Sequence, residues 1–413
     1  MNILKFSVYY YPEQISSAHL TYDIEEALIK AGHKIIIIAP MPSRNVPDDL
    51  RSKYRNLKVE TKYDGALTIR RFRMFKEGKN PLIRAIRYIL CNAIQYIKGC
   101  REKNIDLLFA GSTPPTQGVL CGKVKKKLSK KYGRKIPLIY NLQDVFPDSL
   151  VSAGMTSQGS LLWRLGRKIE NYTYSSADKI IVISNDIKKN ILSKGVPANK
   201  IDVIPNWINT DEVHHVQRKE NGLFDELGID SGKFIIVYAG NLGSAQGIDT
   251  FIEAAKQIDD IEFVIFGDGS SKDEYKSKCD GKNNIHMFPL MPMTRVSEVY
   301  SMSNISLVAC KKGMGSGAVP SKTFSIMASA TPVLLNFDTG TELWNLIESN
   351  NCGICTSAGN VQELVNAMNY AKNHPEELLK MGVNARKCVE NTYCKEIGTN
   401  KIIKSLTDAV EVH

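Results

Sequence analysis

The sequence predicts two α/β domains, each built on a Rossmann-like, doubly wound parallel sheet. With 413 residues the chain is too long for one ordinary hydrophobic core and suits two domains. Strand-like and helix-like segments alternate through both halves, and polar sequence between residues 206 and 233 separates the halves. Ligands of such sheets bind beyond the carboxyl ends of the strands. We therefore expect two similar sheets that face one cleft.

The hydrophobic pattern predicts alternating elements in the first half. The expected strands are Ile3–Tyr9, Lys34–Ala39, Leu107–Gly111, Pro137–Leu142 and Lys179–Ser184. The expected helices are Ala18–Ala31, Ile83–Cys100, Val119–Lys131, Leu161–Ser175 and Asp186–Lys194. These elements make up a first domain of residues 1–208.

The second half repeats the alternation. The expected strands are Phe234–Ala239, Glu262–Phe266, Ile285–Phe288, Ile305–Ala309 and Pro332–Asn336, and the segment around Cys352 also reads as a buried strand. The expected helices are Ile248–Lys256, Arg295–Ser301, Lys322–Ala330, Glu342–Ser349 and Val361–His374. After Pro375 two helices follow without another strand. We expect a second domain at 209–390 and a tail at 391–413, which either packs back across the hinge or forms a simple cap.

Composition argues against several classes of protein. Hydrophobic residues make up 43% and charged residues 23%, as in globular proteins, and no apolar run approaches the roughly 20 residues of a membrane span. The N-terminus enters a strand-like run directly, so we expect a cytoplasmic protein. Nine scattered cysteines indicate no disulfide framework, and the single CxxC pair, Cys352 and Cys355, lacks further ligands. We expect no metal and no cofactor.

Positive charge is concentrated in the first half of the chain. The net charge is +11; residues 123–135 contain eight basic and no acidic residues, and residues 70–103 contain ten basic residues. Such a surface attracts anionic lipid or nucleic acid, and because no nucleic-acid recognition motif accompanies it we expect no nucleic acid. Within residues 82–97 apolar side chains recur at helical spacing. We expect this apolar face to pack on the protein's own core, with membrane contact as the alternative.

The most informative motif is the stretch from Gly313 to Pro332, in which a glycine-rich loop leads through Pro320 into a helix with an early lysine, Lys322. Backbone N–H groups of the loop, the positive end of the helix and the lysine could together bind a diphosphate. An ordinary loop and helix start is the alternative. Two more strands end in glycine turns, at residues 239–243 and 266–270. Three such turns in one domain indicate a nucleotide site.

Read in order, these turns resemble the donor domain of GT-B glycosyltransferases, and family 4 in particular. The resemblance is carried by YAGNLGSAQGIDTFIEA at 238–254, FVIFGDGSS at 263–271, the opening segment at 8–40, NLQDVFPDSL at 141–150 and residues 181–209. It implies transfer of a sugar from a nucleotide donor with retention of configuration. By this resemblance the donor-binding residues are Asn241, Leu242, Gly267, Asp268, Gly269, Phe288, Gly315, Ser316, Gly317, Ser321 and Glu342, and the acceptor-facing loop contains Ser16 and Ser17, where glycines are usual.

The chain also departs from the family. Asn241 and Gln246 stand where an Arg and a Lys are common, and Gly317 and Ser325 stand where two glutamates are common. The pattern VPSKTFSIMAS resembles a subgroup that builds bacterial surface polysaccharide and retains the lysine. We infer that Lys322 stabilises the departing diphosphate, helped by the N–H groups of residues 315–317. Glu342 could replace the missing carboxylate at the ribose or serve as a plain helix-start carboxylate, and Asp268 reads more readily as a turn aspartate.

Asp144 is the polar residue that the resemblance brings nearest to the transferred sugar or the acceptor hydroxyl. A turn and helix cap is the alternative. The resulting expectation is a metal-independent enzyme that moves a sugar from a UDP-linked donor to a lipid-linked acceptor, an undecaprenyl diphosphate saccharide, at the anionic inner face of the plasma membrane. Two rivals are a sugar-nucleotide 2-epimerase of the same fold and a non-catalytic binding module.

Overall fold

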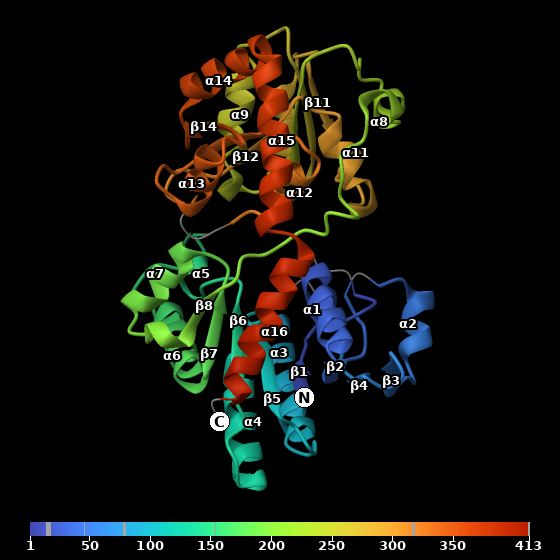
Figure 1. The fold of residues 1–413 in the computed structure, drawn as a ribbon, viewed down its shortest axis with the longest axis vertical. Helices are drawn as coiled ribbons and strands as arrows, with labels where there is room; N and C mark the ends of the chain where they lie inside the picture. Colours follow the sequence, from blue (N-terminus) through green and yellow to red (C-terminus); the bar gives the residue numbers. More distant parts are fainter. Residues whose placement is uncertain (14–17, 45, 77–79, 153, 316–318, 412–413) are drawn as a thin grey trace. The chain divides into compact units, whose positions relative to one another are not determined.

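The computed structural model describes residues 1–13, 18–44, 46–76, 80–152, 154–315 and 319–411. The chain divides into two compact units (Figure 1). The first unit contains residues 1–204 and 399–413, and the second contains residues 205–398. The chain leaves the first unit after residue 204, slightly before the predicted boundary at residue 208. It returns to the first unit at residue 399, after the predicted start of the tail at residue 391.

The first unit is built on an eight-stranded sheet in the order β3-β4-β2-β1-β5-β6-β7-β8. Neighbouring strands are parallel, except that β3 and β4 pair in antiparallel fashion. The strands are β1 Asn2–Phe6, β2 Lys34–Pro40, β3 Val59–Lys62, β4 Leu67–Phe72, β5 Leu107–Gly111, β6 Leu138–Leu142, β7 Lys179–Val182 and β8 Ile201–Val203. The helices are α1 Ala18–Lys30, α2 Asp48–Tyr54, α3 Pro81–Gly99, α4 Thr116–Tyr132, α5 Asp148–Ser152, α6 Leu161–Ser176 and α7 Asn185–Ser193.

No element was predicted between residues 48 and 72, where the structure has α2, β3 and β4. In β4 the alternate residues Leu67, Ile69 and Arg71 are buried. A guanidinium in this inward-facing series interrupts the period-two hydrophobic pattern that identifies a strand. Arg71 is held there by hydrogen bonds to the carbonyl of Tyr11 at 2.6 Å and to the carboxylate of Glu60 at 3.1 Å.

The second unit is built on a six-stranded parallel sheet in the order β11-β10-β9-β12-β13-β14. Counted from β9, this is the 3-2-1-4-5-6 order of dinucleotide-binding sheets, and the chain changes direction between β9 and β12. The strands are β9 Ile235–Asn241, β10 Glu262–Asp268, β11 Ile285–Phe288, β12 Ile305–Ala309, β13 Val333–Phe337 and β14 Gly353–Ser357. The helices are α8 Leu223–Leu227, α9 Ile248–Ala255, α10 Lys272–Cys279, α11 Val296–Ser301, α12 Lys322–Ala328, α13 Glu342–Ser349, α14 Val361–Asn373, α15 Pro375–Thr392 and α16 Lys395–Glu411, which continues into the first unit.

Both faces of the second sheet are buried. In β9, Ile235 and Val237 belong to one hydrophobic cluster, whereas Ile236 and Tyr238 belong to a second cluster on the opposite face. This arrangement explains the continuous apolar run of the strand, because a parallel sheet is covered by helices on both sides. Tyr238 therefore lies on the same side of β9 as Gly240, two residues further on.

The two segments through which the chain passes between the units are joined inside the second unit. The N–H of Ile208 donates to the carbonyl of Tyr393, and the N–H of Lys395 donates to the carbonyl of Ile208, both at 3.0 Å. Trp207 is buried against Gly398, where a Cβ atom would lie 2.2 Å from the indole ring. A glycine is therefore needed at this position for the ring to pack.

Helix α3 buries its polar side and exposes its apolar side. Arg87, Cys91 and Gln95, spaced four residues apart, are each fully buried. The exposed large apolar side chains of the helix are Ile83, Ile86, Ile89, Leu90, Tyr96 and Ile97. The prediction that this apolar face packs on the protein's own core holds for Ile94, which contacts the core, and is wrong for the exposed residues just named. The periodicity identified one face of a helix correctly but could not show which face turns inward.

Hydrogen bonds explain why the polar side of α3 turns inward. The amide of Gln95 donates to the carbonyls of Ser7 and Ile38 at 2.8 and 2.9 Å. The guanidinium of Arg87 donates to the hydroxyl of Ser43 at 2.9 Å and to the carbonyl of Phe75 at 3.3 Å. The carbonyls of Ser7 and Phe75 lie beyond the ends of β1 and β4, and the carbonyl of Ile38 in β2 also accepts from the N–H of Ser7 at 3.2 Å. Helix α3 therefore supplies donors to carbonyl groups at this edge of the sheet.

Replacing Gln95 with Leu should lower the free energy of unfolding by about 2–4 kcal/mol, because two carbonyl groups would lose a buried donor. Replacing the exposed Ile89 with Gln should change it by no more than about 0.5 kcal/mol. Urea unfolding followed by circular dichroism measures both. A stability loss in Ile89→Gln that matches the loss in Gln95→Leu would contradict the inverted packing of α3.

Candidate donor site

Lys322 is the first residue of α12, and its ammonium nitrogen is buried. The Nζ atom has no hydrogen-bond partner among the residues that the structure describes. It lies 3.9 Å from the centroid of the Tyr238 ring, over the aromatic face. Burial lowers the pKa of Lys322 to about 7. A buried cation without a hydrogen-bonding or anionic partner destabilises a fold, and such a perturbed group is a candidate functional residue.

Gly240 makes room for this ammonium group. A Cβ atom at this position would lie 2.5 Å from Nζ of Lys322, and the glycine has φ +150°. Gly240 is the penultimate residue of β9, at the carboxyl end of the strand where the sheet changes direction. Ligands of open α/β sheets bind in the crevice at this switch point. Lys322 therefore presents its charge where the topology places a ligand.

Gly267 and Gly269, which were predicted to bind the donor, allow the ends of β9 and β10 to pack closely together. A Cβ atom on Gly267 would lie 2.6 Å from Cγ of Leu242, and one on Gly269 would lie 2.6 Å from Oδ1 of Asn241. The N–H of Leu242 donates to the carbonyl of Asp268 at 2.9 Å. These glycines thus have a structural role that the sequence motif, interpreted as ligand approach, did not anticipate.

Asn241, Leu242 and Asp268 differ in what they can offer a ligand. Asn241 is exposed at the end of β9, and its carbonyl accepts a hydrogen bond from the Tyr238 hydroxyl at 2.7 Å. The side chain of Leu242, predicted to bind the donor, is fully buried in the hydrophobic core. Asp268 is exposed and accepts from the N–H of Gly269 at 2.9 Å, as a turn aspartate does.

The described part of the glycine-rich loop is bound to a carboxylate of the protein itself. The N–H groups of Gly313 and Gly315 donate to the two oxygens of Asp338 at 2.9 and 2.8 Å. The prediction that the N–H of Gly315 is available to a diphosphate is therefore wrong, because Asp338 occupies it. Asp338 follows β13 directly, and an acidic residue at a strand end was the signal that could have identified it. Ser316 and Gly317 lie outside the described residues.

Three further residues predicted to bind the donor lie at or after the ends of strands of the second sheet. Ser321 is exposed before α12 and makes no side-chain cap. Phe288 ends β11 half-buried, with its ring 5.7 Å from the ring of Phe266. Glu342 is the first residue of α13, whose cap is instead the hydroxyl of Thr341. Tyr238 was not among the predicted site residues, although its place two residues before Gly240 could have identified it.

Asp144 belongs to the first unit, two residues after β6. The residue as a whole is exposed, but partial burial of its carboxyl group raises the pKa of Asp144. Hydrogen bonds from the Ser149 hydroxyl and the Val145 N–H act in the opposite direction and lower it. These local bonds fit a turn before α5, and the open side chain remains accessible to a ligand. Ser16 and Ser17 lie outside the described residues.

The described residues, with the gaps given above, contain neither a cluster of metal ligands nor a membrane-spanning helix. Across those ranges, no three His, Cys, Asp or Glu side chains come together in a way that could hold a metal ion. Among the described helices, none combines the length and the apolar character needed to cross a bilayer.

Comparison with known families gives two matches that together span most of the chain. Residues 17–212 match the family described as "Glycosyltransferase Family 4". Residues 220–388 match the family described as "Glycosyl transferases group 1". The boundary between the matches lies close to the division between the two units.

Individual relatives agree with these matches. WcaI of Escherichia coli, named as a colanic acid biosynthesis glycosyl transferase, is 26% identical over 96% of this chain and 97% of its own length. The structure of sucrose-phosphate synthase from Thermosynechococcus elongatus aligns with a TM-score of 0.78 at 15% identity, covering 100% of both chains. The structure of HepE from Anabaena in complex with UDP-glucose aligns with a TM-score of 0.71 at 14% identity, covering 99% of this chain and 100% of HepE. These likenesses show the GT-B fold.

Replacing Lys322 with Met should stabilise the protein without ligand by roughly 1–3 kcal/mol, because a desolvated ammonium group is replaced by an apolar side chain of similar length. The pKa of Lys322 is about 7 in the folded chain and has an ordinary value of 10.5. The unfolded chain therefore binds more protons between these pH values, and wild-type stability rises with pH there. The advantage of Lys322→Met should be largest below pH 7 and shrink toward pH 10. Thermal melts across this range measure it, and a less stable Lys322→Met protein at pH 6 would contradict the buried, unpaired charge.

Proposed function

Because this chain belongs to the family 4, group 1 glycosyltransferases of GT-B fold, we propose that it transfers a sugar from a UDP-linked donor to a lipid-linked saccharide acceptor. The reaction proceeds with retention of configuration and without a metal ion, and it serves the assembly of a bacterial surface polysaccharide. The observation that carries the proposal is the buried ammonium group of Lys322 at the switch point of the second sheet. The relationship to WcaI, named for colanic acid biosynthesis, supports the polysaccharide assignment.

Lys322 has the charge and position that the reaction needs. As the bond from sugar to phosphate breaks, positive charge develops on the sugar and negative charge on the departing diphosphate. An ammonium group with no hydrogen bond to the described residues keeps its donors available for phosphate oxygens. The approach of a dianionic diphosphate favours the protonated amine, so binding should raise the pKa of Lys322 above its resting value of about 7. Charge in a desolvated site stabilises the transition state more strongly than charge in water.

The departures from the family pattern are consistent with this role. Asn241 and Gln246 are uncharged, and Ser325 is nearly buried on the first turns of α12, with its carbonyl accepting from Ser329. Lys322 therefore takes over the phosphate charge that an Arg and a Lys supply in typical members. Asp144, with its raised pKa and exposed position, is the residue we assign to the acceptor hydroxyl. UDP is the favoured donor nucleotide because HepE, which shares the fold, was solved with UDP-glucose.

Helix α3 and its neighbour α4 supply a surface suited to an anionic membrane. The two helices contact each other (Figure 1). The exposed apolar side chains of α3 form one part of this surface, and four exposed lysines of α4 form the other. These are Lys123, Lys126, Lys127 and Lys130, which share one helix face. An exposed apolar face beside a basic stripe is the pattern of a helix that lies in the membrane interface.

The basic segment of residues 123–135 contributes less positive charge to this surface than its sequence suggested. The Nζ atom of Lys125 donates to the carbonyl of Ser176 at 2.8 Å and to Asp178 at 2.5 Å, so this lysine holds α4 to the loop after α6. Lys131 donates to the carbonyl of Glu102 at 2.9 Å. Arg134 pairs with Asp106 at 2.7 Å and Lys135 with Asp178 at 3.0 Å. The charges of Lys125, Arg134 and Lys135 are therefore compensated within the protein, whereas Lys131 is exposed and bonds only to carbonyl groups.

Donor binding should depend on Lys322 and on its protonation. Lys322→Met should weaken binding of UDP-glucose by about ten- to a hundredfold, the value of charge-assisted hydrogen bonds to a phosphate. Wild-type affinity should fall as the pH rises above 7, because the free amine must take up a proton on binding, whereas the affinity of the variant should stay constant. Isothermal titration calorimetry between pH 6 and 9 measures both effects, with the exposed Lys276→Met as control. Equal affinities of wild type and Lys322→Met would remove the proposed diphosphate site.

Membrane binding should depend on the exposed face of α3. Ile86 and Ile89 are 53% and 65% exposed, and the double replacement by Gln should reduce binding to phosphatidylglycerol vesicles about tenfold or more, because apolar area no longer leaves water. The matched control is Leu161→Gln with Leu165→Gln, which removes two apolar groups that are 85% and 56% exposed from α6 of the same unit. Vesicle sedimentation measures binding, and high salt should weaken the wild type. A loss confined to the α6 variant would refute docking through α3.

A further inference from the structure

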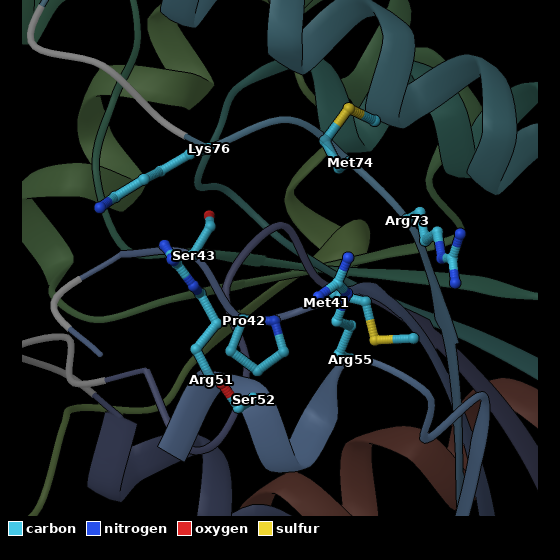
Figure 2. Close-up of a pocket in the computed structure, with 9 residues that line it drawn as sticks. All are labelled: Met41, Pro42, Ser43, Arg51, Ser52, Arg55, Arg73, Met74 and Lys76. Atoms are coloured by element: carbon cyan, nitrogen blue, oxygen red, sulfur yellow. The ribbon is translucent and has the colours of Figure 1, made fainter. Parts of the chain in front are cut away.

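A basic cavity opens in the first unit, apart from any residue assigned above. Its volume is about 470 Å³, within the range of small-molecule sites. It is formed by the segment after β2, by α2 and by the segment after β4, and Figure 2 shows the lining side chains. Met41 and Met74 contribute apolar, adaptable surface. The cationic side chains of the lining are Arg51, Arg55, Arg73 and Lys76.

The charge of this cavity is poorly compensated. Arg51 forms an ion pair with Asp48 at 2.8 Å on the exposed side of α2. Arg55, Arg73 and Lys76 have no ion pair or side-chain hydrogen bond to the residues that the structure describes, and no acidic residue lines the cavity. Several cations around one hollow attract a polyanion, because their potentials add. Arginine in particular recognises phosphate through two parallel hydrogen bonds.

The walls of the cavity are held in place by buried polar groups. Arg87 of α3 donates to the hydroxyl of Ser43 on one wall and to the carbonyl of Phe75 on the other. The carboxylate of Glu13 accepts from the N–H groups of Ser43 and Arg44, both at 2.8 Å. A site whose walls are fixed before binding loses less entropy when the ligand enters. The same bonds connect the cavity to α3, whose apolar face is exposed.

The cavity lies at the edge of the sheet where a substrate is expected. Pro40 ends β2 and Phe72 ends β4, and the N–H of Met41 donates to the carbonyl of Phe72 at 2.8 Å. The cavity therefore lies beyond the carboxyl ends of both strands, at the same edge as Asp144 after β6. From β2 to β6 the sheet advances by three strand positions, or about 14 Å at about 4.8 Å per position. This separation leaves room for saccharide between an anionic group in the cavity and a hydroxyl near Asp144.

We propose that this cavity binds the phosphate or diphosphate group of the lipid-linked acceptor. The cations hold the phosphate oxygens, Met41 and Met74 contact the first part of the lipid, and the chain continues toward the exposed face of α3. The proposal rests on the proposed function for the identity of the acceptor. The shared ligand chemistry is a phosphate ester, which could also come from bulk membrane lipid or from free diphosphate.

The test uses the full chain in a Lys322→Met background, in which the donor site should bind a diphosphate only weakly. Arg55→Gln with Arg73→Gln removes two exposed cations of the cavity, and Lys53→Gln with Lys58→Gln removes two exposed cations outside its lining. Titration calorimetry measures binding of farnesyl diphosphate, inorganic diphosphate and farnesol. Thermal melts confirm that both variants fold. Binding of UDP-glucose is measured in parallel on the same pairs of variants with Lys322 intact.

We expect farnesyl diphosphate to bind about tenfold or more weakly to the Arg55→Gln, Arg73→Gln variant and unchanged to the control variant. We also expect it to bind more tightly than inorganic diphosphate or farnesol. Unchanged affinity in the cavity variant would overturn the proposal. Equal affinity for farnesyl and inorganic diphosphate would overturn the lipid assignment.

Two further outcomes are informative. The first distinguishes bulk membrane lipid from the acceptor as the source of the phosphate, and the second distinguishes failure of the proposed function from failure of the cavity proposal. If the cavity variant lost binding to phosphatidylglycerol vesicles but kept farnesyl diphosphate, the cavity would serve bulk lipid and the acceptor assignment would fall. Failure of the wild type to bind UDP-glucose would contradict the proposed function, whereas a cavity-dependent affinity for farnesyl diphosphate in the same protein would still support the cavity as a diphosphate site.

Discussion

The desolvated ammonium group of Lys322 is the constraint on which the second unit depends. It is buried over the face of Tyr238, against a glycine that leaves no Cβ in its way. Holding a cation there without a hydrogen bond costs stability, and the burial that lowers its pKa to about 7 also makes the site responsive to an incoming anion. The sheet topology puts this charge at the switch point between β9 and β12, where nucleotide ligands of such folds bind.

The first unit depends on a different device, a helix whose polar side turns inward. Arg87 and Gln95 donate to groups at the ends of β1 and β2 and on the segment after β4. Because these donors satisfy the interior, the apolar side of α3 is free to face outward, next to the basic stripe of α4. Arg87 also fixes both walls of the basic cavity. One buried guanidinium thus connects α3 with the carboxyl-terminal edge of the sheet, beside the basic cavity.

The glycine-rich turns show what a residue pattern predicts and what it does not predict. All three lie at strand ends of one sheet, as predicted, yet each glycine acts through a contact that the pattern did not specify. Gly267 and Gly269 admit the side chains of the neighbouring turn, and Gly315 gives its N–H to Asp338. A turn motif shows where the backbone bends closely, but not whether a ligand or another part of the chain takes the space. The strand β4 was missed because a buried Arg71 stands in an inward-facing position, and β3 was missed because it has no buried residue.

The sequence by itself determined the fold class, the division into two units, the order of most strands and helices and the family, because alternating hydrophobicity and strand-end glycines are local signals. It also singled out Lys322. Only the tertiary structure decided that the Lys322 ammonium is buried beside Gly240, that Asp338 occupies the loop N–H groups, that α3 exposes its apolar face and that a basic cavity forms beside β2 and β4. The physical reason is that burial, pKa and pairing arise from contacts between residues far apart in the chain, whereas periodicity reports which residues share a face and not what that face meets.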